Sequence, residues 1–252
     1  MDKIKRPIYK KWWFWLLILI VVIAAISSLS GDKTNTGDLA KNSVGEGLAN
    51  GGAKSSNMAE SSTVKDTNPK SKIEFTNVAL KSTLGLTTVI GEANNKDSEA
   101  HSFTLKVSFY DKDQKLLGTA VGAINDLNGG ESKIFTALAT EDYSKADSHK
   151  IQVDTIVSST KNKVVPIEFS NIVIKDNMGF TTVEGEAKNT DSTAHSFTIV
   201  VGLYDSSKKL VGTATGAVND IAAGDTMTFT AMGTEAVKGI KTHKVQVDTM
   251  VK

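Results

Sequence analysis

An internal duplication constrains this sequence more than any other feature. Residues 73–157 align with residues 167–251 over 85 positions without a gap, and about half of the positions are identical. Two of the shared blocks are GEANNKDSEAHSFTLKVSFYD with GEAKNTDSTAHSFTIVVGLYD, and HKIQVDTIV with HKVQVDTMV. A duplication of this length predicts two copies of one small folding unit, at 73–157 and 167–252.

Each copy shows the period of two that is typical of β-strands. The apolar residues predicted to face inward are Phe103, Leu105, Val107 and Phe109 in the first copy, and Phe197, Ile199, Val201 and Leu203 in the second. Ile151 and Val153 continue this inward pattern in the last strand of the first copy. The outward residues of the second copy are Ser196, Thr198, Val200 and Gly202.

Further runs with strand character cover residues 73–80, 86–93, 116–121 and 132–138, with turn sequences at 111–114 and 128–131. Gly118 and Gly212 fall inside strand patterns, where glycine marks a bulge or a close backbone approach. Six or seven short strands in about 85 residues predict an all-β fold, with each copy a small antiparallel β-sandwich.

The N-terminal 30 residues carry the pattern of a membrane anchor. Residues 12–29 form an uncharged, mainly apolar run of 18 residues, near the lower length limit for a helix that crosses a bilayer. Basic residues precede this run and tryptophans open it, as at a membrane interface. The positive-inside rule predicts a cytoplasmic tail at 1–11, a single transmembrane helix at 12–30, and both copies outside the cytoplasm. The predicted anchor residues are Lys10, Lys11, Trp12, Trp13 and Trp15.

A cleavable signal peptide is the alternative reading of the same segment, although its apolar core is usually shorter and Ala25-Ile26-Ser27 is a poor cleavage site. Residues 31–72 contain no aromatic residue and are rich in Gly, Ser, Asn and Lys, which predicts a flexible stalk. Residues 158–166 predict a short linker that keeps the two copies close together.

Composition and charge exclude several classes of site. The chain has no cysteine, which excludes disulfides, thiolate metal sites and cysteine nucleophiles. The two copies carry net charges of −4 (residues 73–157) and −2 (residues 167–252), whereas a nucleic-acid-binding domain is expected to show a basic face. Arg6 is the only arginine, so no arginine cluster can bind phosphates. Nucleic acid is therefore not predicted as a partner.

The histidines recur at equivalent positions, as His101 and His149 in the first copy and His195 and His243 in the second. Two imidazoles in each copy are too few for a closed metal site, and no cysteine can complete one. His101 and His149 each stand at the start of a predicted strand. A hydrogen-bonding role at the strand ends is therefore preferred to a metal-binding role.

Acidic residues form two candidate clusters. Asp111 and Asp113 resemble a fragment of a calcium loop, but such a loop needs six to eight oxygen ligands. The second copy also has Ser207 in place of Asp113. Glu92 and Asp97, which recur as Glu186 and Asp191, are candidates for acid–base chemistry, although Asn94 and Asn95 beside them favour a polar turn. No catalytic, cofactor-binding or metal-binding residue is predicted, and the protein is not predicted to be an enzyme.

The motif Val107-Ser108-Phe109-Tyr110-Asp111 and its counterpart Val201-Gly202-Leu203-Tyr204-Asp205 are each followed by a lysine-rich turn and a Leu-x-Gly-Thr strand. Each copy resembles the FxLYD domain, a small bacterial extracytoplasmic β-domain, with Val in place of the first Phe. The stretch 6–15 also resembles a leader of membrane proteins in Gram-positive bacteria. The resemblance implies an envelope protein with two immunoglobulin-like modules, in which the motif residues Val107, Phe109, Tyr110, Asp111, Val201, Leu203, Tyr204 and Asp205 are structural.

The two copies differ on part of their surface. Ile90 corresponds to Glu184, Ile134 to Thr228 and Lys106 to Val200, while the inward positions match. Two explanations remain open: the copies bind different partners, or one face of each copy packs on the other. Simple drift after duplication is the third reading.

These observations predict a single-pass protein of the cell membrane with its N-terminus in the cytoplasm. Its two extracytoplasmic modules are expected to bind or scaffold an envelope protein or a cell-wall component, because exposed sheet edges can accept an added strand. The alternatives are a sensor of a small ligand or ion, which requires a concave pocket, and an envelope hydrolase, which requires clustered catalytic groups.

Overall fold

The computed structural model describes residues 64–65, 72–159 and 164–251, and all of their regular structure is antiparallel β-strand. The predicted tail and transmembrane helix at 1–30, with Lys10, Lys11, Trp12, Trp13 and Trp15, lie outside the described residues. Within the described residues, no helix is long and apolar enough to cross a membrane.

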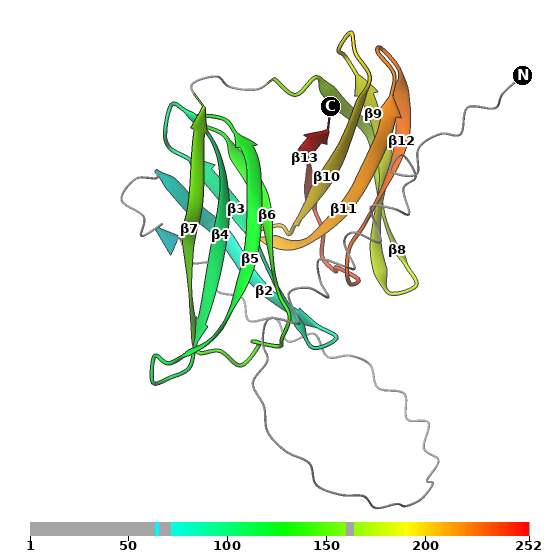
Figure 1. Cartoon of the computed structure of the whole chain (residues 1–252). Helices are drawn as coiled ribbons and strands as arrows, with labels where there is room; N and C mark the ends of the chain where they lie inside the picture. The colour runs from blue at the N-terminus through cyan, green and yellow to red at the C-terminus, as the bar shows by residue number, and fades with distance from the viewer. Residues whose placement is uncertain (1–63, 66–71, 160–163, 252) are drawn as a thin grey trace, which may run out of the picture. The chain divides into compact units, whose positions relative to one another are not determined.

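The strands are numbered in chain order (Figure 1). Within the predicted stalk lies β1 (Val64–Lys65), which pairs with β2. Module 1 contains β2 (Ile73–Thr83), β3 (Leu86–Asn95), β4 (Ala100–Tyr110), β5 (Leu116–Leu127), β6 (Ser132–Ala139) and β7 (Ser148–Ser159). Module 2 contains β8 (Ile167–Asn177), β9 (Phe180–Asn189), β10 (His195–Tyr204), β11 (Leu210–Ile221), β12 (Thr226–Met232) and β13 (Thr242–Val251).

The two modules have the same topology. Strand order is β2-β3-β6-β5-β4-β7 in module 1 and β8-β9-β12-β11-β10-β13 in module 2, with β1 added beside β2. The ladder between β5 and β6 has only two register pairs, Val121 with Leu138 and Gly122 with Ala137. This short ladder lets each sheet curl back on itself, so that β2, β3 and β6 pack against β4, β5 and β7 as the two layers of a sandwich.

Glycine makes the corner of each curled sheet possible. A Cβ atom on Gly122 would lie 2.6 Å from the carbonyl oxygen of Thr136, and one on Gly216 would lie 2.5 Å from that of Thr230. A side chain at either position would push the strands apart. Gly118 and Gly212 also make close approaches, as predicted, because a Cβ there would overlap the side chains of Tyr143 and Val237.

The predicted inward residues form the cores. Phe103, Leu105, Val107 and Phe109 are all buried, and so are their counterparts on β10. Phe75 of β2 joins the two layers. Its ring packs edge-on against the rings of Phe103 and Phe135, with distances between ring centroids of 6.4 Å and 5.5 Å. Burial of each of these large apolar side chains contributes roughly 1.5–3 kcal/mol to the stability of the module. The alternating residues seen in the sequence are therefore the ones that stabilise the sandwich.

One buried asparagine in each module ties the strand ends together. The side-chain amide of Asn95 lies 2.7 Å from the carbonyl oxygen of Glu99, 3.1 Å from that of Leu127 and 3.2 Å from that of Asn128. Its Oδ1 accepts the backbone N–H of Asp97. Asn189 makes the equivalent four contacts in module 2. Asn95 belongs to a polar turn, as the sequence favoured, because its side chain bonds Asp97 and Glu99. It is also 1% exposed and joins the end of β3 to the end of β5, which the sequence did not indicate.

The outward residues of β10 depart from the simple pattern. Val200 and Gly202 were predicted to face outward, yet both are buried. Their counterparts on β4 are Lys106, which is partly exposed, and Ser108, which is itself buried. The greater burial of Val200 relative to Lys106 comes from packing against module 1.

Candidate functional site at the module interface

The two modules pack into one compact unit through an apolar cluster. Ala79, Ile90 and Ile134 of module 1 are buried together with Val200, Tyr204 and Leu210 of module 2. Three of these six positions, Ile90, Ile134 and Val200, are the ones at which the copies differ in character. The structure therefore supports the second of the explanations left open by the sequence, namely that one face of each copy packs on the other.

Gln246 of β13 joins the modules through its side-chain amide. Its Nε2 donates to the carbonyl oxygen of Ile134 at 3.0 Å, and its Oε1 accepts the backbone N–H of Ile134 at 2.9 Å. The amide therefore satisfies both backbone groups of a buried residue of β6, as a neighbouring strand would.

Tyr204 and Glu92 form a second polar contact between the modules. The Tyr204 hydroxyl donates to Glu92 Oε1 at 2.7 Å, while Glu92 Oε2 accepts from the side-chain amide of Asn77 at 2.7 Å. Burial, reinforced by the Glu92 carboxylate, raises the pKa of Tyr204 well above its usual value. The phenol therefore stays protonated and keeps its hydrogen bond throughout the physiological pH range.

Further polar contacts surround the apolar cluster. Lys81 Nζ lies 3.0 Å from Glu235 Oε1, and both side chains are largely buried. Lys244 Nζ donates to the carbonyl oxygen of Ser132 at 2.8 Å. The side-chain amide of Asn125 donates to Thr249 Oγ1 at 3.0 Å. An apolar centre with a polar rim is the usual anatomy of a specific protein interface.

The interface is heterologous, because the two modules use different surfaces. Module 1 contributes the face that carries Glu92, on β2, β3 and β6, and we call it the Glu92 face. Module 2 contributes the face that carries Tyr204, on β10, β11 and β13, and we call it the Tyr204 face. Contacts of this kind are not self-complementary, so they can be repeated from unit to unit.

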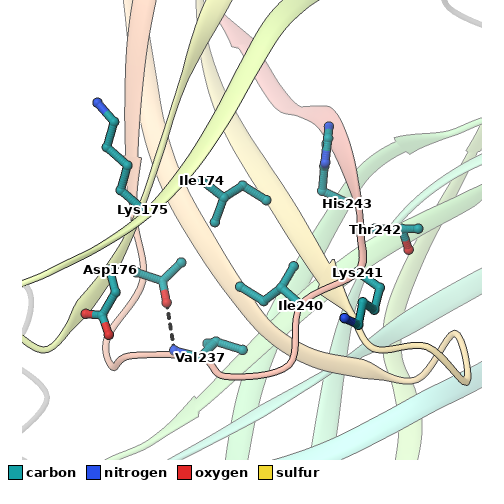
Figure 2. Close-up of a pocket in the computed structure, with 9 residues that line it drawn as sticks. Ile174, Lys175, Asp176, Val237, Ile240, Lys241, Thr242 and His243 are labelled. Atoms are coloured by element: carbon teal, nitrogen blue, oxygen red, sulfur yellow. Dashed lines mark hydrogen bonds between the residues drawn. The ribbon is translucent and has the colours of Figure 1, made fainter.

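In the described part of the chain, three hollows lie at or beside the interface, and the smallest, of about 140 Å³, lies between Lys81 and Ile90 of module 1 and Gly212 and Glu235 of module 2. A cavity of about 500 Å³ is bounded by residues of both modules: Asn77, Glu92, Tyr204, Asp205, Ser206, Lys208, Lys241, Thr242, His243 and Lys244. A second cavity of about 320 Å³ lies within module 2 (Figure 2), where Ile174 and Ile240 form an apolar wall and Lys241, Thr242 and His243 are shared with the first. Thr181 Oγ1 accepts the backbone N–H of Val237 at 2.7 Å and fixes the loop that closes this wall.

The motif residues lie in the cores and at the turns of the two modules. Val107, Phe109, Val201 and Leu203 are buried in the cores. The Asp111 carboxylate accepts the backbone N–H groups of Asp113 and Lys115, and the Asp205 carboxylate accepts those of Ser207 and Lys209. Each aspartate therefore holds the turn after its strand through backbone N–H groups, so the turn forms with either Asp113 or Ser207.

The two motif tyrosines differ in environment. Tyr204 is buried at the interface, whereas Tyr110 is partly exposed on module 1. The same residue type therefore performs an interface role in one copy, and in the other copy it occupies a surface that no module covers within the described residues.

The histidines lie near strand starts, as predicted, but they do not come together. His101 is the second residue of β4 and His149 the second of β7, and the two strands are antiparallel. His149 pairs with Phe109, eight residues along β4 from His101, a separation of roughly 26 Å at 3.3 Å per residue. His101 Nδ1 lies 3.0 Å from Ser158 Oγ, and its Nε2 lies 3.5 Å from Asp97.

A His–Asp contact recurs at the same place in both modules. His195 Nε2 lies 2.7 Å from Asp191 Oδ2. The hydrogen bond with His195, followed by that from the Ser192 backbone, lowers the pKa of Asp191. The equivalent turn of module 1 behaves alike, since the Ser98 backbone N–H lowers the pKa of Asp97. Both carboxylates are partly exposed and bind their own turns, so we assign them a structural role.

The remaining acidic candidates do not form a catalytic or metal-binding cluster. Glu92 contacts Tyr204 and Asn77, whereas Asp97 contacts His101 and Lys72, so the two carboxylates have separate partners. Among residues 72–159 and 164–251, no three His, Asp or Glu side chains lie close enough to hold a metal ion.

Sequence reasoning identified some of the interface residues and missed others. Ile90, Ile134 and Val200 were found because they differ between the copies. Gln246, Tyr204 and Leu210 were missed, because each is identical in the other copy as Gln152, Tyr110 and Leu116. A residue that is the same in a buried and in an exposed setting gives no signal in the aligned repeats.

Comparison with known proteins adds no relative to this description. No protein-family model matches the chain, and no curated protein matches its sequence significantly.

Proposed function

We propose that this protein is a membrane-anchored binding or scaffolding protein of the cell envelope, with its N-terminus in the cytoplasm and its two modules outside. The observation that carries the proposal is the interface between the modules. Its buried apolar cluster and its hydrogen bonds join the two copies into one compact unit. A fixed pair of modules presents its surfaces to a partner at a smaller entropic cost than two independent modules would.

The strand order supports an immunoglobulin-like assignment of each module within this proposal. If β2 to β7 are named A, B, C, C′, E and F, one layer is A-B-E and the other is C′-C-F. This is the arrangement of immunoglobulin-like sandwiches without strands D and G. The outer strands β8 and β13 of the second sheet are suited to pairing with an added strand. Together with the motif residues, this order favours the proposed FxLYD relationship.

The sensor hypothesis ranks second. The cavity beside the interface has the size of a ligand site, but its lining combines the carboxylates of Glu92 and Asp205 with lysines. Glu92 is already engaged by Tyr204 and Asn77. The lining therefore selects no class of ligand, and a macromolecular partner remains the better proposal.

Topology is the first test. Lys112→Cys introduces a unique thiol in the exposed turn after β4, because the chain has no cysteine. We expect a membrane-impermeant maleimide to label this variant in intact cells to the same extent as after lysis. A variant with cysteine at position 2, in the predicted cytoplasmic tail, is the control and is expected to react only after lysis. Labelling of Lys112→Cys only after lysis would invert the orientation and exclude an envelope role.

A further inference from the structure

Each module keeps a copy of the surface that the other module uses at the interface. Module 1 carries the counterpart of the Tyr204 face, which we call the Tyr110 face: Lys106, Ser108, Tyr110, Leu116, Glu141, Lys150 and Gln152. Module 2 carries the counterpart of the Glu92 face, which we call the Glu186 face: Val173, Lys175, Glu184, Glu186, Thr226 and Thr228. Neither face is covered by a module within the described residues.

The polar contacts that Tyr204, Gln246, Glu235 and Lys244 make at the interface can be repeated between these two faces. Tyr110 and Glu186 repeat the pair of Tyr204 and Glu92, and Gln152 repeats Gln246 opposite the backbone of Thr228. Glu141 and Lys175 repeat Glu235 and Lys81, while Lys150 repeats Lys244. The Asn171 amide holds Glu186 Oε2 at 2.7 Å, as Asn77 holds that of Glu92. The carboxylate on module 2 is therefore already oriented as it is at the interface.

Where the two outer faces differ from the interface faces, the replacements are complementary to each other. The apolar residues Ile90 and Val200 of the interface are replaced by the acid Glu184 on one face and the base Lys106 on the other. Opposite charges across an interface favour association and fix its register. In the free chain Glu184 pairs with Lys175 and Lys106 with Asp154. These exposed pairs are weak, so they can be exchanged on docking.

Side-chain volume is compensated as well. A Cβ atom on Gly202 would lie 2.6 Å from Ile134 Cδ1 and 3.0 Å from Tyr204 Cε2, so glycine gives the isoleucine side chain room at the interface. The two outer faces carry Ser108 and Thr228 at these positions. Threonine has no δ-carbon, and its smaller side chain leaves space for the Cβ of a serine.

Apolar side chains on these faces are exposed. Leu116 is 52% exposed, whereas its counterpart Leu210 is fully buried at the interface. Val173 is 49% exposed, whereas its counterpart Ala79 is 7% exposed. Docking of the Tyr110 face on a Glu186 face would bury both side chains.

We propose that a second copy of this chain is a partner, with the Tyr110 face of one copy docked on the Glu186 face of the next. Because the contact is heterologous, repetition gives a ring or an open row of chains. The inference deepens the proposed binding role by naming a partner and rests on that role, but it does not depend on the membrane anchor or on the orientation of the modules.

Cross-linking of the full chain tests this assembly. In the double variant Gln152→Cys/Thr228→Cys, the two thiols are predicted to meet only between chains. In the matched control Gln246→Cys/Ile134→Cys, the equivalent thiols meet within one chain. Cells that make each variant are treated with a short, membrane-permeant bis-maleimide and analysed on a denaturing gel. The permeant reagent makes the result independent of topology, so failure of assembly and failure of anchoring are distinguished.

We expect Gln152→Cys/Thr228→Cys to give a ladder of dimers and larger species, and the control to stay at the mass of one chain. Adding Glu184→Lys is expected to remove at least nine tenths of the ladder, and adding Lys106→Glu as well is expected to restore it. The proposal would be overturned if the control variant formed its cross-link within one chain while Gln152→Cys/Thr228→Cys stayed monomeric. Equal dimer formation by the single variant Gln152→Cys would overturn it too, since a heterologous contact never brings two copies of position 152 together.

Discussion

Replacing Leu210 with alanine is expected to lower the free energy of unfolding by about 3 kcal/mol, the typical loss for a fully buried leucine. Leu210 is fully buried in the cluster between the modules and does not belong to the core of module 2. The loss therefore measures the coupling of the modules. Urea denaturation of the full chain in detergent, monitored by far-ultraviolet circular dichroism, gives this free energy.

The duplication supplies the control for this measurement. Leu116 occupies the same position in module 1 and is half exposed. Leu116→Ala is expected to change the free energy of unfolding by about 0.5 kcal/mol or less, when the measurement is made at a concentration where the chain is monomeric. Equal losses for the two variants would mean that position 210 supports its own module, and that the interface adds nothing.

Replacing Asn95 with alanine is expected to destabilise module 1 by about 3 kcal/mol, because buried polar groups that lose their partners cost about 1–3 kcal/mol each when no water replaces the bond. The change removes the donors for the carbonyl oxygens of Glu99, Leu127 and Asn128, as well as the acceptor for the Asp97 N–H. Hydrogen exchange of the amides in β4 and β7 of the full chain reports the loss within module 1.

Asn94 is the neighbouring control for this variant. Its amide bonds the carbonyl oxygen of Glu74 and Thr76 Oγ1 on the outward face of the sheet, where it is partly exposed. Asn94→Ala is expected to cost about 1 kcal/mol or less, since water can replace these bonds. A result in which Asn94→Ala costs as much as Asn95→Ala would contradict the role assigned to the buried amide.

The alternating pattern allowed much of the fold to be predicted. The inward residues of β4 and β10, the turns at 111–114 and 128–131, and the close approaches of Gly118 and Gly212 all follow from local rules of pleat, turn chemistry and glycine geometry. The curl of each sheet was not predicted. It depends on a two-residue ladder at Gly122, and pairing between strands far apart in sequence has no local signature.

The interface was only partly predictable, for a physical reason. Burial of an outward face favours apolar side chains over charged ones. Val200 is buried at the interface, whereas its partly exposed counterpart in module 1 is Lys106. Tyr204 and Gln246 needed no change, because their hydrogen-bonding groups are compatible with both water and a partner. The role of Asn95 in joining the strand ends was missed because its three carbonyl partners lie on a strand end and loops that the sequence does not place.

The central claim is that the two modules form one body, and a distance distribution tests it most directly. Lys112→Cys and Ser192→Cys place one exposed thiol on each module of a chain without other cysteines. Spin labels are attached to the two thiols of the full chain, and the distance between them is measured by pulsed electron paramagnetic resonance. The labelled protein is diluted with unlabelled protein, so that only distances within one chain contribute. We predict a single narrow distribution that broadens when Leu210→Ala is added. A broad distribution in the unaltered pair would show that the modules move independently, and it would contradict the account.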